Sequence, residues 1–116
     1  MLRRPRAAAP LVADVAALRF GTLSVDIGAR EVRSDGSLVD LTRTEFDVLA
    51  TLAARPRLVF TRRQLIDAIW GETWVGDEHL VDVHIGHLRR KLGDDPDAGR
   101  FVRTVRGVGY RMGEGR

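Results

Sequence analysis

The sequence predicts an α+β domain in which a four-stranded antiparallel sheet, three helices and a C-terminal β-hairpin follow one another. Two changes of hydrophobic period predict this order. Short alternating segments separated by turn residues fill residues 18–41, and apolar residues then recur at helical spacing up to residue 92. Two further strand-like segments follow at residues 101–105 and 109–112.

Length and composition limit the class of protein. The chain has 116 residues and 44% hydrophobic content, which suits one folded domain with a modest core. It has no cysteine, so it has no disulfide framework or thiolate metal site, and we expect a cytoplasmic location. No apolar run approaches the roughly 18 residues that cross a bilayer. Pro10 and Asp14 break the run that follows the N-terminal arginines, so residues 1–10 are not interpreted as a signal peptide.

The formal net charge is only +3, although the sequence pI is about 10.5. The pI is high because Lys91 is the only lysine and arginine does not titrate below about pH 12. Bulk charge is therefore weak evidence for nucleic-acid binding. The positions of the arginines must decide the question.

The N-terminal part is expected to be a linker followed by a sheet. Residues 1–14 are rich in Arg, Ala and Pro, so we expect a linker there, a domain over 15–113 and a tail over 114–116. Strands are predicted at residues 18–20, 23–27, 30–33 and 37–41. Asp35-Gly36 between the last two is a strong hairpin signal.

Two capping boxes predict the starts of the first two helices. Thr42 and Glu45 open a helix that should end near residue 54, before Arg55-Pro56. Thr61 and Gln64 open a second helix that Gly71 ends. The apolar face of this second helix is predicted to comprise Leu65, Ala68, Ile69 and Trp70.

The third helix, predicted over residues 77–93 with Asp77 as its cap, organises the chain. Its apolar residues form one stripe, made of Val81, Ile85, Leu88 and Leu92. The opposite side then carries His79, Val83, Gly86, His87 and Arg90, with Asp82 and Arg89 on one flank and His84 and Lys91 on the other. Two helices joined by a turn and followed by a hairpin form a winged helix-turn-helix arrangement.

The run from about residue 41 to residue 112 closely resembles the effector domain of OmpR/PhoB-type response regulators. Five blocks carry the resemblance, in order: LTRTEFDVL at 41–49, VFTRRQL at 59–65, IWG at 69–71, VDVHI with LRRKLG at 81–93, and TVRGVGYR at 104–111. With the N-terminal strands, the match covers about residues 18–112. It implies an isolated effector domain. An acidic receiver domain would be expected upstream, and its end plus a linker would account for residues 1–10.

The resemblance implies a DNA interface. It assigns base contacts to positions that the helical wheel places on or beside the outward face, namely Asp82, Val83 and His87. It assigns phosphate contacts to Arg62, Trp70, His79, His84, Arg89 and Tyr110. Arg106, at the tip of the predicted hairpin, is expected to enter the minor groove.

Some positions depart from the family pattern or stay open. The family commonly has Arg where this chain has His87, so base preference there should differ. Gly86 replaces a position often occupied by a basic residue, and it is either a close-approach position or a tolerated surface glycine. The role of Arg90 stays open, because the wheel aims it at the groove while the resemblance favours Arg89.

Other functions are less well supported. His79, His84 and His87 are poorly arranged for a shared metal, and the acidic turn at residues 94–97 lacks the glycine and glutamate of a calcium loop. No nucleophile motif or P-loop suggests an enzyme. A protein-interaction module is the stronger alternative, and salt dependence of DNA binding would distinguish it.

The expected function is a transcription-factor domain of a two-component system, without cofactor or metal. As the resemblance implies, two domains bind direct repeats head to tail, with the sheet of one against the wing side of the other. The isolated domain should be mainly monomeric, and a sensor kinase would act only through the receiver. RNA polymerase is a possible partner of the loop between the last two helices, which contains Glu72, Thr73 and Trp74.

Overall fold

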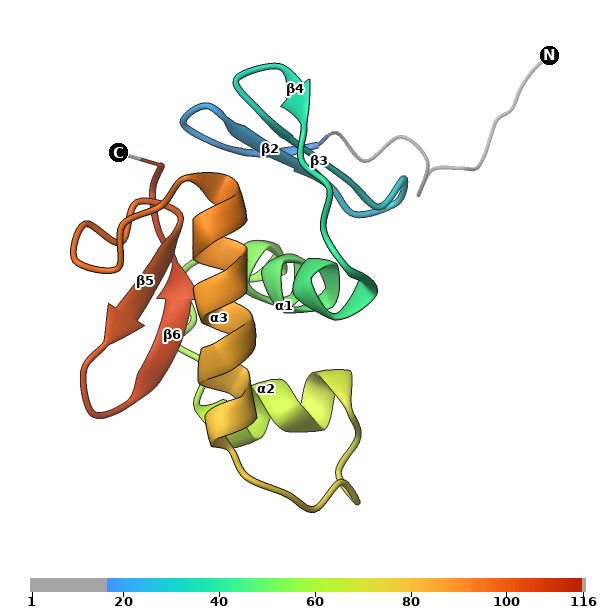
Figure 1. Cartoon of the computed structure of the whole chain (residues 1–116), viewed down its shortest axis with the longest axis vertical. Helices are drawn as coiled ribbons and strands as arrows, with labels where there is room; N and C mark the ends of the chain where they lie inside the picture. The colour runs from blue at the N-terminus through green and yellow to red at the C-terminus, as the bar shows by residue number, and fades with distance from the viewer. Residues whose placement is uncertain (1–16, 116) are drawn as a thin grey trace, which may run out of the picture.

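The protein is described here by a computed structural model, which covers residues 17–115. Within that range, four strands form an antiparallel meander, three helices follow, and two strands form a C-terminal hairpin, called the wing below (Figure 1). This is the predicted α+β winged-helix order. The elements are β1 (Leu18–Phe20), β2 (Leu23–Asp26), β3 (Glu31–Ser34), β4 (Ser37–Leu38), α1 (Arg43–Ala54), α2 (Arg62–Ile69), α3 (His79–Leu92), β5 (Val102–Val105) and β6 (Gly109–Met112).

The sheet lies at one end of the molecule and covers α1. Leu23 pairs with Ser34 and Val25 with Val32, so one side of the meander turns its apolar side chains to the core. Asp35 and Gly36 both have positive φ, as the predicted tight hairpin turn between β3 and β4 requires.

The two predicted capping boxes are confirmed. In α1 the Thr42 hydroxyl accepts from the Glu45 N–H, and the Glu45 carboxylate accepts from the Thr42 N–H. Thr61 and Gln64 form the same reciprocal pair at the start of α2. Each box satisfies two backbone donors that a helix start otherwise leaves unpaired, so both starts are determined by local sequence.

The core face predicted for α2 is partly wrong. Leu65 is buried as expected, but Ala68 is exposed and Ile66 is buried in its place. The helix has only eight residues, and it packs against both α1 and α3. The side it buries is therefore decided by how it crosses those two helices, which the spacing of its own residues does not encode.

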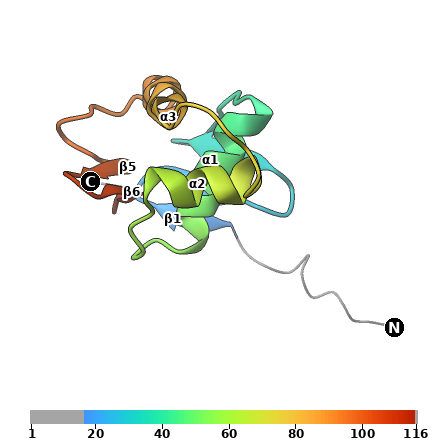
Figure 2. The ribbon, with the colours of Figure 1, turned by 90° about the horizontal axis from the view of Figure 1, so that it is seen from below.

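The predicted core stripe of α3 is confirmed, because Val81, Ile85, Leu88 and Leu92 are all buried. The helix begins at His79, two residues after the predicted start. Asp77 lies outside it, but its carboxylate still accepts from the His79 N–H at 2.9 Å. Figure 2 shows α3 end-on at the edge of the molecule, with one side toward the other elements and the other side facing solvent.

The wing is attached to the helical core through its second strand. Phe60, between α1 and α2, exchanges two backbone hydrogen bonds with Tyr110 at 2.7 and 2.9 Å. Gly109 allows this approach, because a Cβ there would lie 2.0 Å from the Phe60 carbonyl oxygen. This isolated β-bridge to the hairpin fixes the backbone position of Tyr110.

The predicted linker over residues 1–14 lies outside the described residues. Of the predicted tail, Gly115 is buried, and its N–H donates to the Arg100 carbonyl at 2.8 Å. Within the described residues no helix is long and apolar enough to span a membrane.

Candidate nucleic-acid interface

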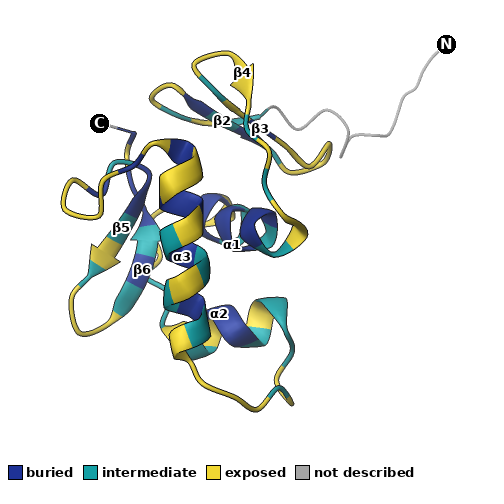
Figure 3. Ribbon diagram, viewed as in Figure 1, coloured by how far each residue is buried: buried dark blue, intermediate teal, exposed yellow. Residues whose placement is uncertain are grey.

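The outward face of α3 is open to solvent. Val83 is 48% exposed and the His87 side chain 47% exposed, and Arg90 is exposed beside them (Figure 3). Gly86 lies between them, and nothing lies within 4 Å of where its Cβ would be. A helix with this face uncovered has the shape and side-chain variety that a major groove accepts.

Asp82 differs from these residues because its carboxylate is already engaged by three side chains. Arg62 Nε of α2 donates to its Oδ1 at 2.8 Å, and the Tyr110 hydroxyl of β6 donates to the same oxygen. His79 Nδ1, one turn earlier on α3, lies 3.3 Å from Oδ2. Asp82 thus joins α2, α3 and the wing, although its side chain is still 23% exposed.

This contact network shifts the pKa values of its members. Burial of the Asp82 carboxyl works to raise its pKa, but the hydrogen bonds from Arg62 and Tyr110 outweigh burial and lower the pKa below its usual value. The hydrogen bond to Asp82 raises the pKa of Arg62. Burial, with the same carboxylate, raises the pKa of Tyr110. At neutral pH the Asp82 carboxylate is therefore charged and the Tyr110 phenol is neutral.

Arg89 is 8% exposed and is directed inward. Its guanidinium donates to the Val102 carbonyl from Nε at 3.2 Å and from a terminal nitrogen at 2.9 Å. The same terminal nitrogen donates to Thr104 Oγ1 at 2.7 Å, and the group lies 5.8 Å from the centre of the Tyr110 ring. These bonds attach the first wing strand to α3.

Asp94 provides a second attachment just beyond α3. Its side chain accepts from three successive backbone N–H groups at 2.9 to 3.0 Å, those of Arg100, Phe101 and Val102. Because Asp94 is almost fully buried, these bonds fix the entry of the chain into β5. The sequence predicted only an acidic turn at residues 94–97. No local signal showed that it would accept these bonds.

The tip of the wing carries Arg106. Gly107 follows it with φ +77°, a left-handed conformation that the turn requires. Arg106 is exposed, as is Val108 after the turn. The tip lies beside the N-terminal half of α3 (Figure 1). One protein surface thus presents both the outward face of α3 and the arginine at the hairpin tip.

The flank of α3 away from the wing is aromatic. The His84 ring lies 5.5 Å from the Trp70 ring and 6.5 Å from the His87 ring, and Trp70 lies 5.9 Å from Trp74. His84 Nδ1 is buried without a hydrogen-bond partner among the described residues. Trp74 is half-buried on Trp70, whereas Glu72 and Thr73 of the same loop are exposed.

Glu45 is a site neighbour whose role sequence analysis did not predict. Besides capping α1, its carboxylate accepts from Lys91 Nζ at 2.7 Å, and its other oxygen lies 4.0 Å from His87 Nδ1. Burial works to raise the pKa of Glu45, but the Lys91 bond and the Thr42 N–H lower it below its usual value. These partners lie 46 residues apart, so no local spacing could have shown the contact.

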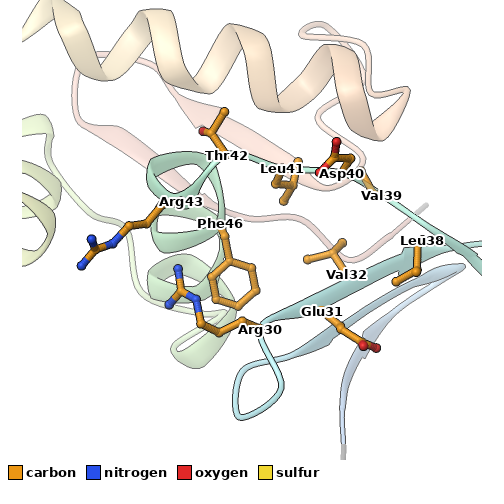
Figure 4. Close-up of a pocket in the computed structure, with 10 residues that line it drawn as sticks. All are labelled: Arg30, Glu31, Val32, Leu38, Val39, Asp40, Leu41, Thr42, Arg43 and Phe46. Atoms are coloured by element: carbon orange, nitrogen blue, oxygen red, sulfur yellow. The ribbon is translucent and has the colours of Figure 1, made fainter.

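No group of three or more potential metal ligands occurs among residues 17–115. An open groove lies elsewhere, between the sheet and the start of α1, with a volume of about 770 Å³ (Figure 4). Arg30 lies over the Phe46 ring at its edge and donates to Asp47 at 3.0 Å. The groove is lined by Arg30, Glu31, Val32, Leu38, Val39, Asp40, Leu41, Thr42, Arg43 and Phe46.

Comparison with known proteins gives consistent matches. A family model described as "Transcriptional regulatory protein, C terminal" matches residues 36–112. The DNA-binding response regulator MtrA of Mycolicibacterium smegmatis is 44% identical over 96 residues, which are 83% of this chain and 42% of MtrA. The transcriptional regulatory protein PrrA of Mycobacterium leprae is 45% identical over 111 residues, 95% of this chain and 46% of PrrA.

Among solved structures, the DNA-binding domain of Klebsiella pneumoniae RstA in complex with the RstA box superposes with a TM-score of 0.77. It is 34% identical, and the match covers 84% of this chain and 97% of that one. The chain thus spans under half the length of these curated relatives but matches nearly all of an isolated DNA-binding domain.

Proposed function

We propose, from the premise that this chain belongs to the OmpR/PhoB family of response-regulator C-terminal DNA-binding domains, that it binds specific duplex DNA with α3 in the major groove and Arg106 in the adjacent minor groove. The family is one of transcription regulators and not of enzymes. The observation that carries the proposal is the shared surface of the outward face of α3 and the wing tip, held together by Asp82 and Arg89.

The proposed base contacts are Val83, His87 and Asp82 in the major groove. Val83 presents methyl groups that suit a thymine methyl, and the His87 imidazole offers one donor and one acceptor when neutral. Asp82 can accept from a cytosine amino group through the oxygen that faces His79. Arg106 supplies the minor-groove contact, where its charge matches the negative potential.

The proposed phosphate contacts surround this face. Arg62, His79 and Tyr110 lie together on the wing side through their bonds with Asp82. Trp70 and His84 lie on the other side with their rings in contact, and the Trp70 indole N–H is the proposed donor. Arg89 is 8% exposed, so its main proposed role is to hold β5 beside α3, with phosphate contact through its exposed edge.

The partners of the longer protein follow from the same premise. We propose that two domains bind direct repeats head to tail, with the sheet side of one against the wing side of the next. The groove in Figure 4, with Leu38 61% exposed beside it, offers a suitable surface on the sheet side. A receiver domain, phosphorylated by a sensor kinase in the cytoplasm, would pair the domains and raise their local concentration. The isolated domain should be mainly monomeric.

A second surface is proposed for RNA polymerase. The loop between α2 and α3 exposes Glu72 and Thr73, and the ring of Trp74 packs on Trp70. A Cβ on Gly76 would lie 2.5 Å from the Trp74 ring, so the loop is folded back on this tryptophan. The packing gives the exposed residues a defined position, as a docking loop needs.

A salt titration of DNA binding tests the proposal. Bound sequences are first selected from a random duplex pool, and affinity is then measured by gel shift for the wild type and Arg106→Ala. About five phosphate contacts predict a log–log slope near −4 to −5. Arg106→Ala should weaken binding, whereas Arg19→Ala, which removes the same charge from exposed β1, should not. No salt slope, or equal affinity of the wild type and Arg106→Ala, contradicts the proposal.

A further inference from the structure

The Asp82 carboxylate contacts three side chains that the proposed function assigns to DNA phosphates. Arg62 Nε and the Tyr110 hydroxyl both donate to Oδ1, and His79 Nδ1 lies 3.3 Å from Oδ2. A carboxylate and a phosphate are both anionic oxygen acceptors, and guanidinium groups bind either one. In the free domain the carboxylate therefore has the place that a phosphate oxygen would take on DNA.

We propose that Asp82 acts as an internal substitute for a DNA phosphate, which suppresses binding to non-cognate duplexes because the loss of its bonds is compensated only at a cognate site. The inference rests on the proposed function and deepens it. Asp82 becomes a specificity-determining residue because it competes with every phosphate for Arg62, Tyr110 and His79. Only a base that donates a hydrogen bond to the carboxylate can replace the bonds that Asp82 loses when a phosphate takes these donors.

The position of the network allows this exchange. The Arg62 side chain is 47% exposed and Asp82 is 23% exposed, so a phosphate can reach Arg62 without opening the core. Tyr110 is held by its backbone bonds to Phe60, so its hydroxyl stays near α3 whichever acceptor it binds. The lowered pKa of Asp82 keeps the carboxylate charged at neutral pH, where the competition must operate.

Cognate and non-cognate DNA differ in what they offer Asp82. Any duplex brings a phosphate to Arg62 and displaces the Asp82 carboxylate, which then lies close to that phosphate. The two negative charges repel each other, because their separation is within the Debye length of about 10 Å at 0.1 M salt. A cytosine amino group in the groove donates to the carboxylate and offsets the lost bonds. The repulsion therefore remains on non-cognate DNA and is offset on a cognate site. Asp82 thus favours cognate over non-cognate duplexes by weakening binding to the latter.

Asp82→Asn tests the inference, because the amide keeps the shape and loses the charge. Affinity is measured against a random-sequence duplex and against the selected duplex, over a range of salt concentrations. We expect Asp82→Asn to bind the random duplex about fivefold more tightly at low salt, the size of one exposed ion pair. Its log–log slope should steepen by about one, since the Asp82 charge no longer offsets the one phosphate that Arg62 neutralises. The ratio of specific to non-specific affinity should fall.

Asp67→Asn is the matched control. Asp67 pairs with Arg63 on α2 at 2.8 Å, so the substitution removes the same charge from an Asp–Arg pair on the same helix as Arg62. It should leave the slope and the specificity ratio unchanged. In the double variant Arg62→Ala with Asp82→Asn, the gain on random duplex should disappear, because no released guanidinium remains.

Other outcomes overturn the inference. If Asp82→Asn binds random duplex no more tightly than the wild type, or gains no more than Asp67→Asn, then Asp82 only positions the wing. If the wild type binds no duplex at all, the proposed function itself fails. A second measurement does not depend on any variant folding: the Arg62 Nε–H NMR signal of the wild type should shift when random duplex is added. A bound complex with that signal unchanged shows that no exchange occurs.

Discussion

The two flanks of α3 are held by different chemistry. On the wing flank, defined by Asp82 and Arg89, both side chains make short hydrogen bonds to other elements, and their charges are neutralised or directed inward. On the histidine flank, defined by His84, His87 and Lys91, Lys91 bonds Glu45, but the rings meet in tilted and edge-on contacts without hydrogen bonds between them, and one imidazole nitrogen is buried without a partner among the described residues.

The difference assigns different tasks to the two flanks. Several charge-assisted bonds to one strand fix a distance and an angle, so the wing flank sets the position of the hairpin relative to α3. Ring contacts constrain the side chains less. The His87 side chain is 47% exposed, and its only acidic neighbour among the described residues is Glu45, 4.0 Å from Nδ1. The wing flank therefore provides geometry, and the histidine flank provides adaptable contacts.

The largest effect is expected at Arg89. Arg89→Met keeps the apolar stem but leaves the Val102 carbonyl and the Thr104 hydroxyl without their donor. Because bonds to charged groups contribute about 1.5–3 kcal/mol, we expect a loss of about 2 kcal/mol in the free energy of unfolding, measured by chemical denaturation. Arg90→Met, at the exposed neighbour, should change stability by less than about 0.5 kcal/mol. Equal losses in the two variants would show that Arg89 does not hold the wing strand to α3.

A smaller effect is expected on the histidine flank at Lys91. Lys91→Met removes the ammonium group that lies 2.7 Å from the buried Glu45 carboxylate. Glu45 keeps its bond from the Thr42 N–H, and the Lys91 side chain is partly exposed, so we expect a loss of about 1 kcal/mol in the same measurement. A loss as large as that of Arg89→Met would mean that the two flanks are equally constrained.

The pH dependence of stability should report Glu45. Its folded pKa lies below its ordinary value of 4.5, so its contribution is present above pH 4.5 and is lost as pH falls through the folded pKa. The pKa of Asp82 is also lowered in the folded state, so Asp82 adds to the same loss of stability at acid pH. Unfolding free energies measured from pH 6 downward should therefore fall below pH 4.5. Glu45→Gln should flatten this fall, and an unchanged acid limb in that variant would contradict the assignment.

The smallest effect is expected at Gly86, which lies between the flanks. A Cβ there meets nothing within 4 Å, so Gly86→Ala should stabilise the helix by about 0.5–1 kcal/mol, measured by thermal unfolding. Duplex affinity of the same variant separates the two interpretations of the glycine. Unchanged affinity identifies a tolerated surface glycine, and weakened affinity identifies a close approach of DNA to the backbone. A loss of stability would contradict the open space around this residue.

Most of the fold was predictable because its signals are local. The capping boxes at Thr42 and Thr61 act within four residues, and the Asp35-Gly36 turn and the α3 stripe depend on short spacings. The predictions failed where packing decides. Ala68 is exposed and Ile66 buried because a two-turn helix can bury either side, depending on how its neighbours cross it.

The sequence alone determined the order of elements, the buried stripe of α3 and the outward placement of Val83 and His87. Only the tertiary structure decided which charged groups meet. Asp82 bonds Arg62 and Tyr110 across 20 and 28 residues, and Glu45 bonds Lys91 across 46. Hydrophobic periodicity is a property of one segment, whereas the partner of a charge depends on how separate segments pack. For that reason the sequence placed Asp82 beside the outward face of α3 but did not show that its carboxylate holds the proposed phosphate-binding groups.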